Sequence, residues 1–203
     1  MKFVLGIKQN MSQIFDEEGS VIPVTLLSVP PMVVTQIKDE KRDGYKSVQI
    51  GFSEKKEKNI SKPIKGHLKG LGNFAFLREF NYSEDQKFKV GDTIKSDIFS
   101  PGDIVAVSSI SKGKGFQGVV KRHGFKGGPR THGQKHSERE PGSIGMTGPQ
   151  RVMKGKRMPG RMGGDRVTVK NLKVVAVDPQ TQIILVSGAV PGRRGTLVEI
   201  RSI

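Results

Sequence analysis

The sequence predicts a mainly β protein, in which a β-barrel body carries a small α+β elaboration and a long irregular basic arm. Short runs rich in Val, Ile and Thr recur along the chain, and Pro, Gly, Asn and Asp residues typical of turns separate them. Between residues 111 and 164, by contrast, glycine and proline interrupt every possible strand or helix. With 203 residues, the chain is long enough to bury a core outside that segment.

The expected strands lie on both sides of the glycine-rich segment. They are Val21–Val29, Met32–Lys38, Ser47–Phe52, Asp103–Ser109, Arg166–Asp178 and Ile183–Val186. Many short strands with frequent turns favour a barrel or a sandwich. Asp178–Gln182, between two apolar runs, predicts a hairpin connection. One helix is expected over Ser61–Lys69, with Pro63 in its first turn and Gly70 or Gly72 at its end.

The positive charge is concentrated in one part of the chain. The sequence has 35 Lys and Arg against 19 Asp and Glu, a formal net charge of +16. Residues 1–110 carry 16 basic and 14 acidic side chains, residues 111–170 carry 15 and 3, and residues 171–203 carry 4 and 2. The middle segment also holds 14 of the 26 glycines, so we expect that it cannot build a core of its own.

These patterns divide the chain into a body and an insertion. The body comprises residues 1–110 and 165–203, with the small α+β elaboration at 53–88, and the extended Gly-rich basic arm comprises residues 111–164. A structureless segment of this length is expected inside a compact domain only where it has a function or where a partner orders it.

Composition excludes several classes of protein. The chain has no cysteine, which rules out zinc ribbons and thiol enzymes and suits a reducing compartment. The start of the sequence lacks the pattern of a signal peptide, and no apolar run approaches the roughly 20 residues of a spanning helix. We therefore expect a soluble, cytoplasmic protein with no membrane partner.

Two motifs in the basic arm imitate cofactor sites. Gly113–Gly118 spells GxGxxG, but only Val119–His123 is free of glycine before Gly124, too few residues for a dinucleotide-binding crossover helix. The same glycines resemble a kinase loop, yet the sequence contains neither an HRD nor a DFG triplet. No cofactor and no small-molecule substrate are expected.

The histidines and carboxylates of the arm do not form a convincing metal or catalytic site. His123, His132 and His136 could ligate a metal, but the neighbouring carboxylates Glu138 and Glu140 lie among arginines that compete for them. Stacking on bases or hydrogen bonding to phosphates suits these histidines better. An enzyme acting on RNA would need clustered carboxylates or a positioned base, so we expect no catalysis.

The spacing of cations in the arm favours RNA as the partner. Glycine lets the backbone approach a crowded surface, and Arg and Lys bind phosphates. A DNA-binding protein would offer a recognition helix or a zinc module, and neither is present. The alternative is a solvated basic loop, which usually lacks interleaved apolar residues such as Phe116, Phe125 and Ile144. The candidate rRNA-binding residues are Lys112, Lys114, Lys121, Arg122, His123, Lys126, Arg130, His132, Lys135, Arg151, Lys154, Lys156, Arg157 and Arg161.

Along nearly its whole length the chain resembles the universal large-subunit ribosomal protein L-three family, bacterial type. The stretches that carry the match are MSQIFDEEGSVIPVTLL (Met11–Leu27), VVTQIK with DGYKSVQIGF (to Phe52), KVGDTIKSDIFSPGDIV (Lys89–Val105), SKGKGFQGVVKRHGFKGGPRTHG (Ser111–Gly133), PGSIG (Pro141–Gly145), GKRMPGRMGGDRVTVKNLKVV (Gly155–Val175) and LVSGAVPGRRG (Leu185–Gly195).

The resemblance implies a structural role in the large ribosomal subunit. It implies a barrel of the translation-factor type, direct binding near the 3′ end of 23S rRNA and a part in nucleating subunit assembly. It also implies an arm that runs toward the peptidyl transferase centre and a cluster with the large-subunit proteins L-fourteen and L-nineteen. The family's motifs assign rRNA contacts to Lys112, Lys114, Lys121, Arg122, His123, Lys126, Lys156, Arg157 and Arg161.

Four positions depart from the family pattern, and one of them is Met153, where an aromatic residue commonly precedes Lys-Gly. Asn10 stands where most relatives have Gly, and Glu140 places an acid before PGSIG. Some bacterial relatives carry a methylated glutamine just after SIG, whereas this chain has Met146 there. We therefore expect no modification at that site.

Overall fold

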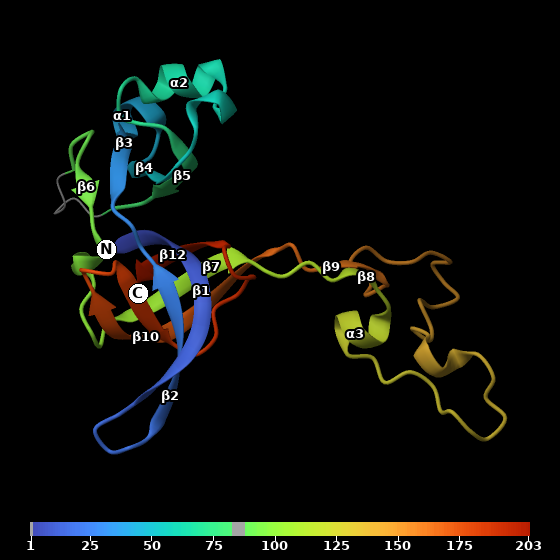
Figure 1. Ribbon diagram of the computed structural model, residues 1–203. Helices are drawn as coiled ribbons and strands as arrows, with labels where there is room; N and C mark the ends of the chain where they lie inside the picture. Colours follow the sequence, from blue (N-terminus) through green and yellow to red (C-terminus); the bar gives the residue numbers. More distant parts are fainter. Residues whose placement is uncertain (1, 83–87) are drawn as a thin grey trace. The chain divides into compact units, whose positions relative to one another are not determined.

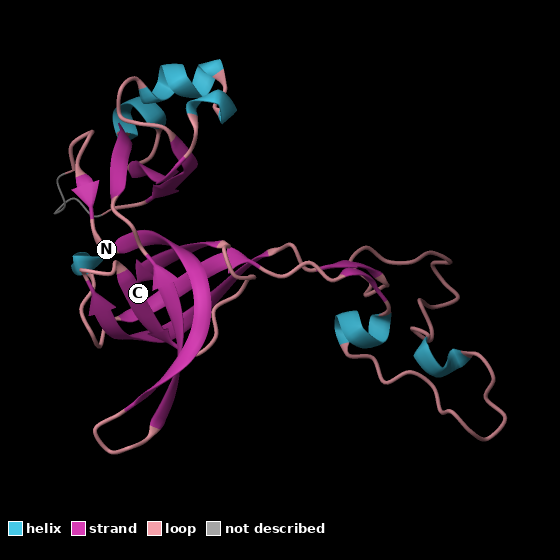
Figure 2. Cartoon of the chain, viewed as in Figure 1, coloured by secondary structure: helices cyan, strands magenta, loops and turns pink. Residues whose placement is uncertain are grey.

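A computed structural model describes residues 2–82 and 88–203, and the chain divides into two compact units (Figure 1). Unit 1 contains the residues up to Ile110 and from Arg166 onward, and unit 2 contains Ser111–Asp165. Strands account for 42% of the described residues and helices for 13%, which confirms the mainly β class (Figure 2). No helix within the described ranges is long and apolar enough to cross a membrane.

Six antiparallel strands of unit 1 close into a barrel. Its order is β1 (Phe3–Phe15), β12 (Leu197–Ser202), β7 (Ile104–Ile110), β10 (Arg166–Asp178), β11 (Ile183–Ser187) and β2 (Val21–Ser28), and β2 pairs again with β1. Closure leaves the paired parts of these strands without a free edge. The alternation of apolar and polar residues places Val105 and Val107 of β7, together with Val198 and Ile200 of β12, in the core.

The expected hairpin between β10 and β11 is confirmed, with Asp178 opposite Ile183. The Asp178 carboxylate accepts hydrogen bonds from the amides of Gln180 and Thr181 and from the Thr181 hydroxyl. These donors, the Thr181 hydroxyl foremost, lower the pKa of Asp178 because they stabilise its ionised form. The side chain of the first turn residue therefore fixes the turn.

Unit 1 also contains a four-stranded antiparallel sheet. Its order is β5 (Phe74–Phe80), β4 (Ser47–Glu54), β3 (Met32–Lys38) and β6 (Thr93–Ile94). The connections carry α1 (Glu40–Asp43), η1 (Glu57–Asn59) and α2 (Lys62–Leu68), and η2 (Ser96–Ile98) follows β6. The helix expected over Ser61–Lys69 is thus present as α2.

The α+β part is larger than the expected elaboration at 53–88, because it begins at Met32. We assigned Met32–Lys38 and Ser47–Phe52 to the barrel body, but these two strands pair with each other and with β5 and β6. Their apolar pattern suits either sheet, since a strand's composition does not specify its partner.

One continuous core joins the barrel to the four-stranded sheet. Phe3 of β1 stacks on Phe80 of β5 with ring centroids 4.8 Å apart, and the same cluster includes Met32 and Ile50 from the sheet and Ile200 from the barrel. Unit 1 therefore folds around a single apolar centre.

Unit 2 is inserted between two neighbouring barrel strands. In the β7–β10 pair, Ile110 lies directly opposite Arg166, so the chain leaves and re-enters the barrel at adjacent positions. Unit 2 contains β8 (Gly115–Gln117), α3 (Val119–His123), η3 (Ser137–Arg139) and β9 (Gly160–Met162). The expectation that every possible element is interrupted was wrong here, because β8 and β9 are short enough to pair between the glycines.

A cluster of charged and polar side chains links β3 and β5 of the four-stranded sheet. Glu79 of β5 forms a salt bridge with Lys38 of β3 at 2.8 Å, and the Tyr45 hydroxyl donates to the same carboxylate at 2.9 Å. The hydrogen bond from Lys38 is the main reason why the pKa of Glu79 is lowered.

Replacing Glu79 by Gln should lower the Tm by roughly 2 °C at neutral pH, an estimate discounted for the partial exposure of the pair. Since the folded-state pKa of Glu79 lies below its ordinary value of 4.5, the wild-type advantage exists above that pH and is lost as the pH falls through the lower, folded-state pKa. Thermal melts of both proteins between neutral and acidic pH measure this. Glu17→Gln, in an exposed turn, is the control; a Glu79 effect independent of pH would contradict the prediction.

Candidate nucleic-acid interface

Unit 2 carries most of the protein's excess charge on its surface. Its 55 residues contain 13 Lys and Arg and 3 Asp and Glu, a net charge of +10. All of these cations except Arg122 are exposed: Lys112, Lys114, Lys121, Lys126, Arg130, Lys135, Arg139, Arg151, Lys154, Lys156, Arg157 and Arg161. Among the described residues, Arg130 is the only one of them in a salt bridge. The surface is therefore charged and largely unneutralised.

The two segments that begin and end unit 2 form a hydrogen-bonded ribbon. The Ser111 amide donates to the Asp165 carbonyl at 2.8 Å, and the Lys114 amide donates to the Met162 carbonyl at 2.9 Å. Gly163 adopts φ +77°, and a Cβ there would collide with the Lys112 carbonyl oxygen. A glycine is thus required for the two backbones to lie this close.

The ribbon presents an aromatic ring beside a guanidinium. Phe116 of β8 is directly opposite Arg161 of β9, so both side chains project from the same face. The Phe116 ring is 75% exposed. An exposed ring is a stacking platform for a base, and the neighbouring Arg161 can bind a phosphate.

Helix α3 carries its cations in its last turn, and hydrogen bonds attach it to the segment that precedes β9. Arg122 donates from Nη1 to the Met158 carbonyl at 2.7 Å, and His123 Nε2 lies 3.0 Å from the same oxygen, where it must donate. Val119, one turn earlier on the same side of the helix, is buried, with 2% of its surface exposed. In the unbound protein, Arg122 and His123 therefore also hold unit 2 together.

A second close approach shapes the loop between α3 and η3. The Gly128 amide lies 3.2 Å from the Ser137 carbonyl and 3.1 Å from that of Glu138, and Gly127 has no room for a Cβ against Glu138. Arg130 forms a 2.6 Å salt bridge with Glu138, whose hydrogen bond raises the pKa of the guanidinium above its usual value. A hollow of about 520 Å³ lies here, lined in part by Lys126, Gln134 and Glu140.

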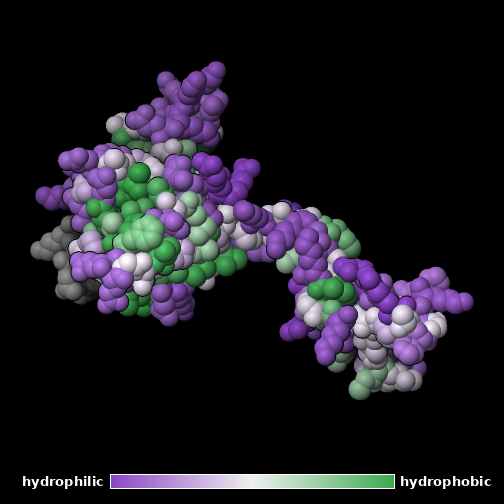
Figure 3. Space-filling model, turned by 60° about the horizontal axis from the view of Figure 1, so that its bottom comes forward, coloured by the Kyte–Doolittle hydropathy of each residue, from purple (hydrophilic) through white to green (hydrophobic). Residues whose placement is uncertain are grey.

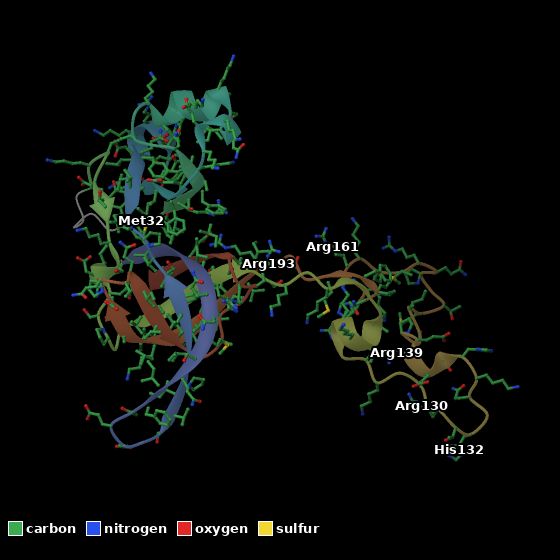
Figure 4. All side chains as sticks on the ribbon, viewed as in Figure 1. Met32, Arg130, His132, Arg139, Arg161 and Arg193 are labelled. Carbon is green, nitrogen blue, oxygen red and sulfur yellow. The ribbon has the colours of Figure 1, made fainter. Side chains whose placement is uncertain are left out.

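The candidate residues thus fall into four places in unit 2, one of which is the segment between η3 and β9 that carries Arg151, Lys154, Lys156 and Arg157. Lys112, Lys114 and Arg161 lie on or beside the ribbon, and Arg122 and His123 lie on α3. Arg130 and His132 lie on the loop that leads to η3, where Figure 4 also shows Arg139. The structure does not gather His123, His132 and His136 into a metal site, since the described residues contain no group of three His, Cys, Asp or Glu able to hold an ion.

Phe116 is not among the contact residues predicted from the sequence, where its apolar side chain indicated only burial against a partner. Met146 is 77% exposed and Met153 is 56% exposed, so these apolar side chains also remain uncovered within the protein. Alternation in the short run Gly115–Gln117 could have indicated an outward-facing ring, but three residues are too few to recognise a strand from sequence.

The chain matches the family described as "Ribosomal protein L3" over residues 67–183. It is 48% identical over 204 residues to "Large ribosomal subunit protein uL3" of Finegoldia magna, covering 99% of this chain and 97% of the relative. It is 53% identical over 200 residues to the protein of the same description from Roseiflexus sp., covering 98% of this chain and 95% of the relative. A relative from Geobacillus stearothermophilus is 48% identical over 204 residues, covering 99% and 95%.

Arg122→Ala should loosen the attachment of α3 to the segment before β9, whereas Arg157→Ala should not, because the structure gives Arg157 no internal partner within the described residues. We expect amide exchange in β8 and β9 to rise about tenfold in Arg122→Ala, the effect of losing a charged hydrogen bond. Hydrogen exchange of the free protein measures both variants. Equal rates in the two would show that Arg122 has no structural role.

Proposed function

The chain belongs to the ribosomal protein L3 family, and on that premise we propose that it is a structural constituent of the large ribosomal subunit that binds 23S rRNA through unit 2. The observation that carries the proposal is the exposed, unneutralised charge of +10 on a segment of 55 residues. Polyphosphate is the partner that such a surface fits, because each bound cation releases condensed counterions.

The protein works in this proposal by binding, without chemistry. Exposed Lys and Arg side chains contact phosphates, and Phe116 stacks on an unpaired base. Glycines such as Gly163 have no Cβ, so the backbone can lie close to a crowded RNA surface. Arg122 and His123 can turn from the Met158 carbonyl to phosphate oxygens once RNA supplies acceptors. No step requires an enzyme activity, a cofactor or a small-molecule substrate.

The finer features follow from family membership. We propose that the body is of the translation-factor barrel type, that it docks near the 3′ end of 23S rRNA, and that binding helps to nucleate subunit assembly. Unit 2 then acts as the arm that extends toward the peptidyl transferase centre, and the ribosomal proteins L-fourteen and L-nineteen are the proposed protein neighbours. A cytoplasmic location on the ribosome is part of the same proposal.

Binding to large-subunit rRNA should depend steeply on salt. If the exposed cations of unit 2 neutralise 6–10 phosphates, the affinity should fall by about 10³–10⁵ between 50 and 200 mM monovalent salt. Filter binding with an rRNA transcript over that range gives the slope. A flat salt dependence would refute an electrostatic interface.

Replacing both Arg157 and Arg161 by Ala should weaken rRNA binding without lowering the Tm of the free protein. Both side chains are exposed and neither is in a salt bridge within the described ranges, so their loss leaves no buried group unsatisfied. About tenfold weaker binding and a shallower salt slope are expected. A Tm drop of many degrees would place these arginines in a core and would contradict the proposed interface.

A further inference from the structure

A second excess of positive charge lies in unit 1, on one short segment. Residues 55–69 contain 6 Lys and 1 Glu, a net charge of +5, whereas the rest of unit 1 carries 16 basic and 15 acidic side chains. These lysines are Lys55, Lys56, Lys58, Lys62, Lys65 and Lys69, and we call them the lysine face. Figure 3 shows hydrophilic side chains gathered over the helical part of unit 1.

Buried side chains anchor the segment that carries the lysine face. Lys62, Lys65 and Lys69 are spaced three and four residues apart on and just after α2, which places them on one side of the helix. Leu68 is turned away from Lys62 and Lys69, lies one turn after Lys65, and is 2% exposed. Ile60 is buried between η1 and α2, so both helical segments are anchored. The cations therefore sit on a formed surface and not on a loose tail.

Little of this charge is neutralised within the protein. Lys65 forms a 2.9 Å salt bridge with Glu57, and the hydrogen bond from Lys65 lowers the pKa of that exposed carboxyl. Glu57 is the single acid of the segment. Within the described residues, the remaining lysines of the face form no salt bridge of their own, so five of the six positive charges have no ion-pair partner there.

A glycine lies in the middle of the cationic side of α2. Gly66 is four residues after Lys62 and three before Lys69, which puts it on the same side of the helix. A Cβ at Gly66 would meet no atom within 4 Å, and its backbone is not in the left-handed region. Neither packing nor backbone geometry calls for glycine there, although glycine weakens a helix. The residue does permit another molecule to approach the backbone between the lysines.

We propose that the lysine face is a second RNA-binding surface, which clamps the phosphate backbone of folded rRNA over Gly66 independently of unit 2. Lys62 and Lys69 contact phosphates on either side of the glycine, and Lys55, Lys56 and Lys58 extend the contact along the backbone. This inference rests on the proposed ribosomal function, because it takes rRNA as the polyanion.

The distribution of apolar residues favours RNA over a lipid surface. A helix that lies on a membrane presents large apolar side chains beside its basic residues at the lipid boundary. In α2 the apolar residues Ile64 and Leu68 are turned away from Lys62 and Lys69; Leu68 is buried in unit 1, and Ile64 is 41% exposed on the far side from these lysines. The side that carries Lys62, Gly66 and Lys69 is hydrophilic, as a phosphate-binding surface requires.

The test compares two triple variants of the full chain that remove the same charge. Lys58→Ala with Lys62→Ala and Lys69→Ala weakens the lysine face and leaves the Lys65–Glu57 pair intact. Lys89→Ala with Lys95→Ala and Lys173→Ala is the matched control, because these lysines are exposed on unit 1 outside the face. Binding to a large-subunit rRNA transcript is measured across salt concentrations. The first variant should bind about tenfold more weakly with a salt slope smaller by about 2, and the control should change less than about twofold.

A neutral substitution tests the close approach over the glycine. Gly66→Gln keeps the charge and favours the helix, so the Tm should stay the same or rise. The longer side chain should nevertheless weaken rRNA binding about fivefold, because it stands between the lysines where the phosphate backbone passes. Wild-type affinity in Gly66→Gln would overturn the clamp over Gly66.

A variant that combines the three lysine-face substitutions with Arg157→Ala and Arg161→Ala distinguishes this inference from the proposed function of unit 2. Contacts at independent sites add, so the combined variant should show the sum of the two losses in binding free energy. If the arginine variant binds normally while the lysine-face variant is weakened, unit 2 is not the interface and the inference stands. If the lysine-face variant binds rRNA like the control, the inference is overturned. If the lysine-face variant lost binding to phosphatidylserine vesicles but kept its affinity for rRNA, the inference would likewise be overturned.

Discussion

The antiparallel pairing of β7 with β10 is the contact on which the organisation of the chain depends. It closes one side of the barrel, and it places Ile110 opposite Arg166, where the chain leaves unit 1 and returns. Because the ends of the insertion are already held together by the ladder, 55 residues can be added without breaking the barrel core. The pairing of β8 with β9 continues the same antiparallel relationship inside unit 2.

Unit 1 and unit 2 hold their cations in different ways. Unit 1 has a continuous core, and the lysine face is carried on segments anchored by the buried side chains of Ile60 and Leu68. Unit 2 has little apolar surface to bury, with Val119 as its one fully buried hydrophobic residue. Its shape depends instead on backbone pairing, on glycines that allow close approach, and on the Met158 carbonyl shared by Arg122 and His123. Such a segment can keep many exposed charges, and it offers Phe116 and Met146 for burial by a partner.

Much of the fold could be predicted from the pattern of residues. The strands of the two flanks, the helix with Pro63 in its first turn and the hairpin at Asp178 follow from local propensities and turn residues. The partners of Met32–Lys38 and Ser47–Phe52 could not be predicted, because β-branched residues suit any sheet with one buried face. The elements β8, α3 and β9 were missed because three to five residues between glycines give no periodicity to recognise.

For the candidate interfaces, the sequence by itself determined where the charge lies along the chain and that its partner should be a polyanion, because charge is a property of each residue alone. The tertiary structure decided which charges are available. It engages Arg122 and His123 with the Met158 carbonyl, pairs Arg130 with Glu138 and sets Phe116 beside Arg161. It also sets Lys62 and Lys69 on one side of α2, with Leu68 of the same helix buried. Availability depends on distances between residues far apart in sequence, and only the packed chain fixes those distances.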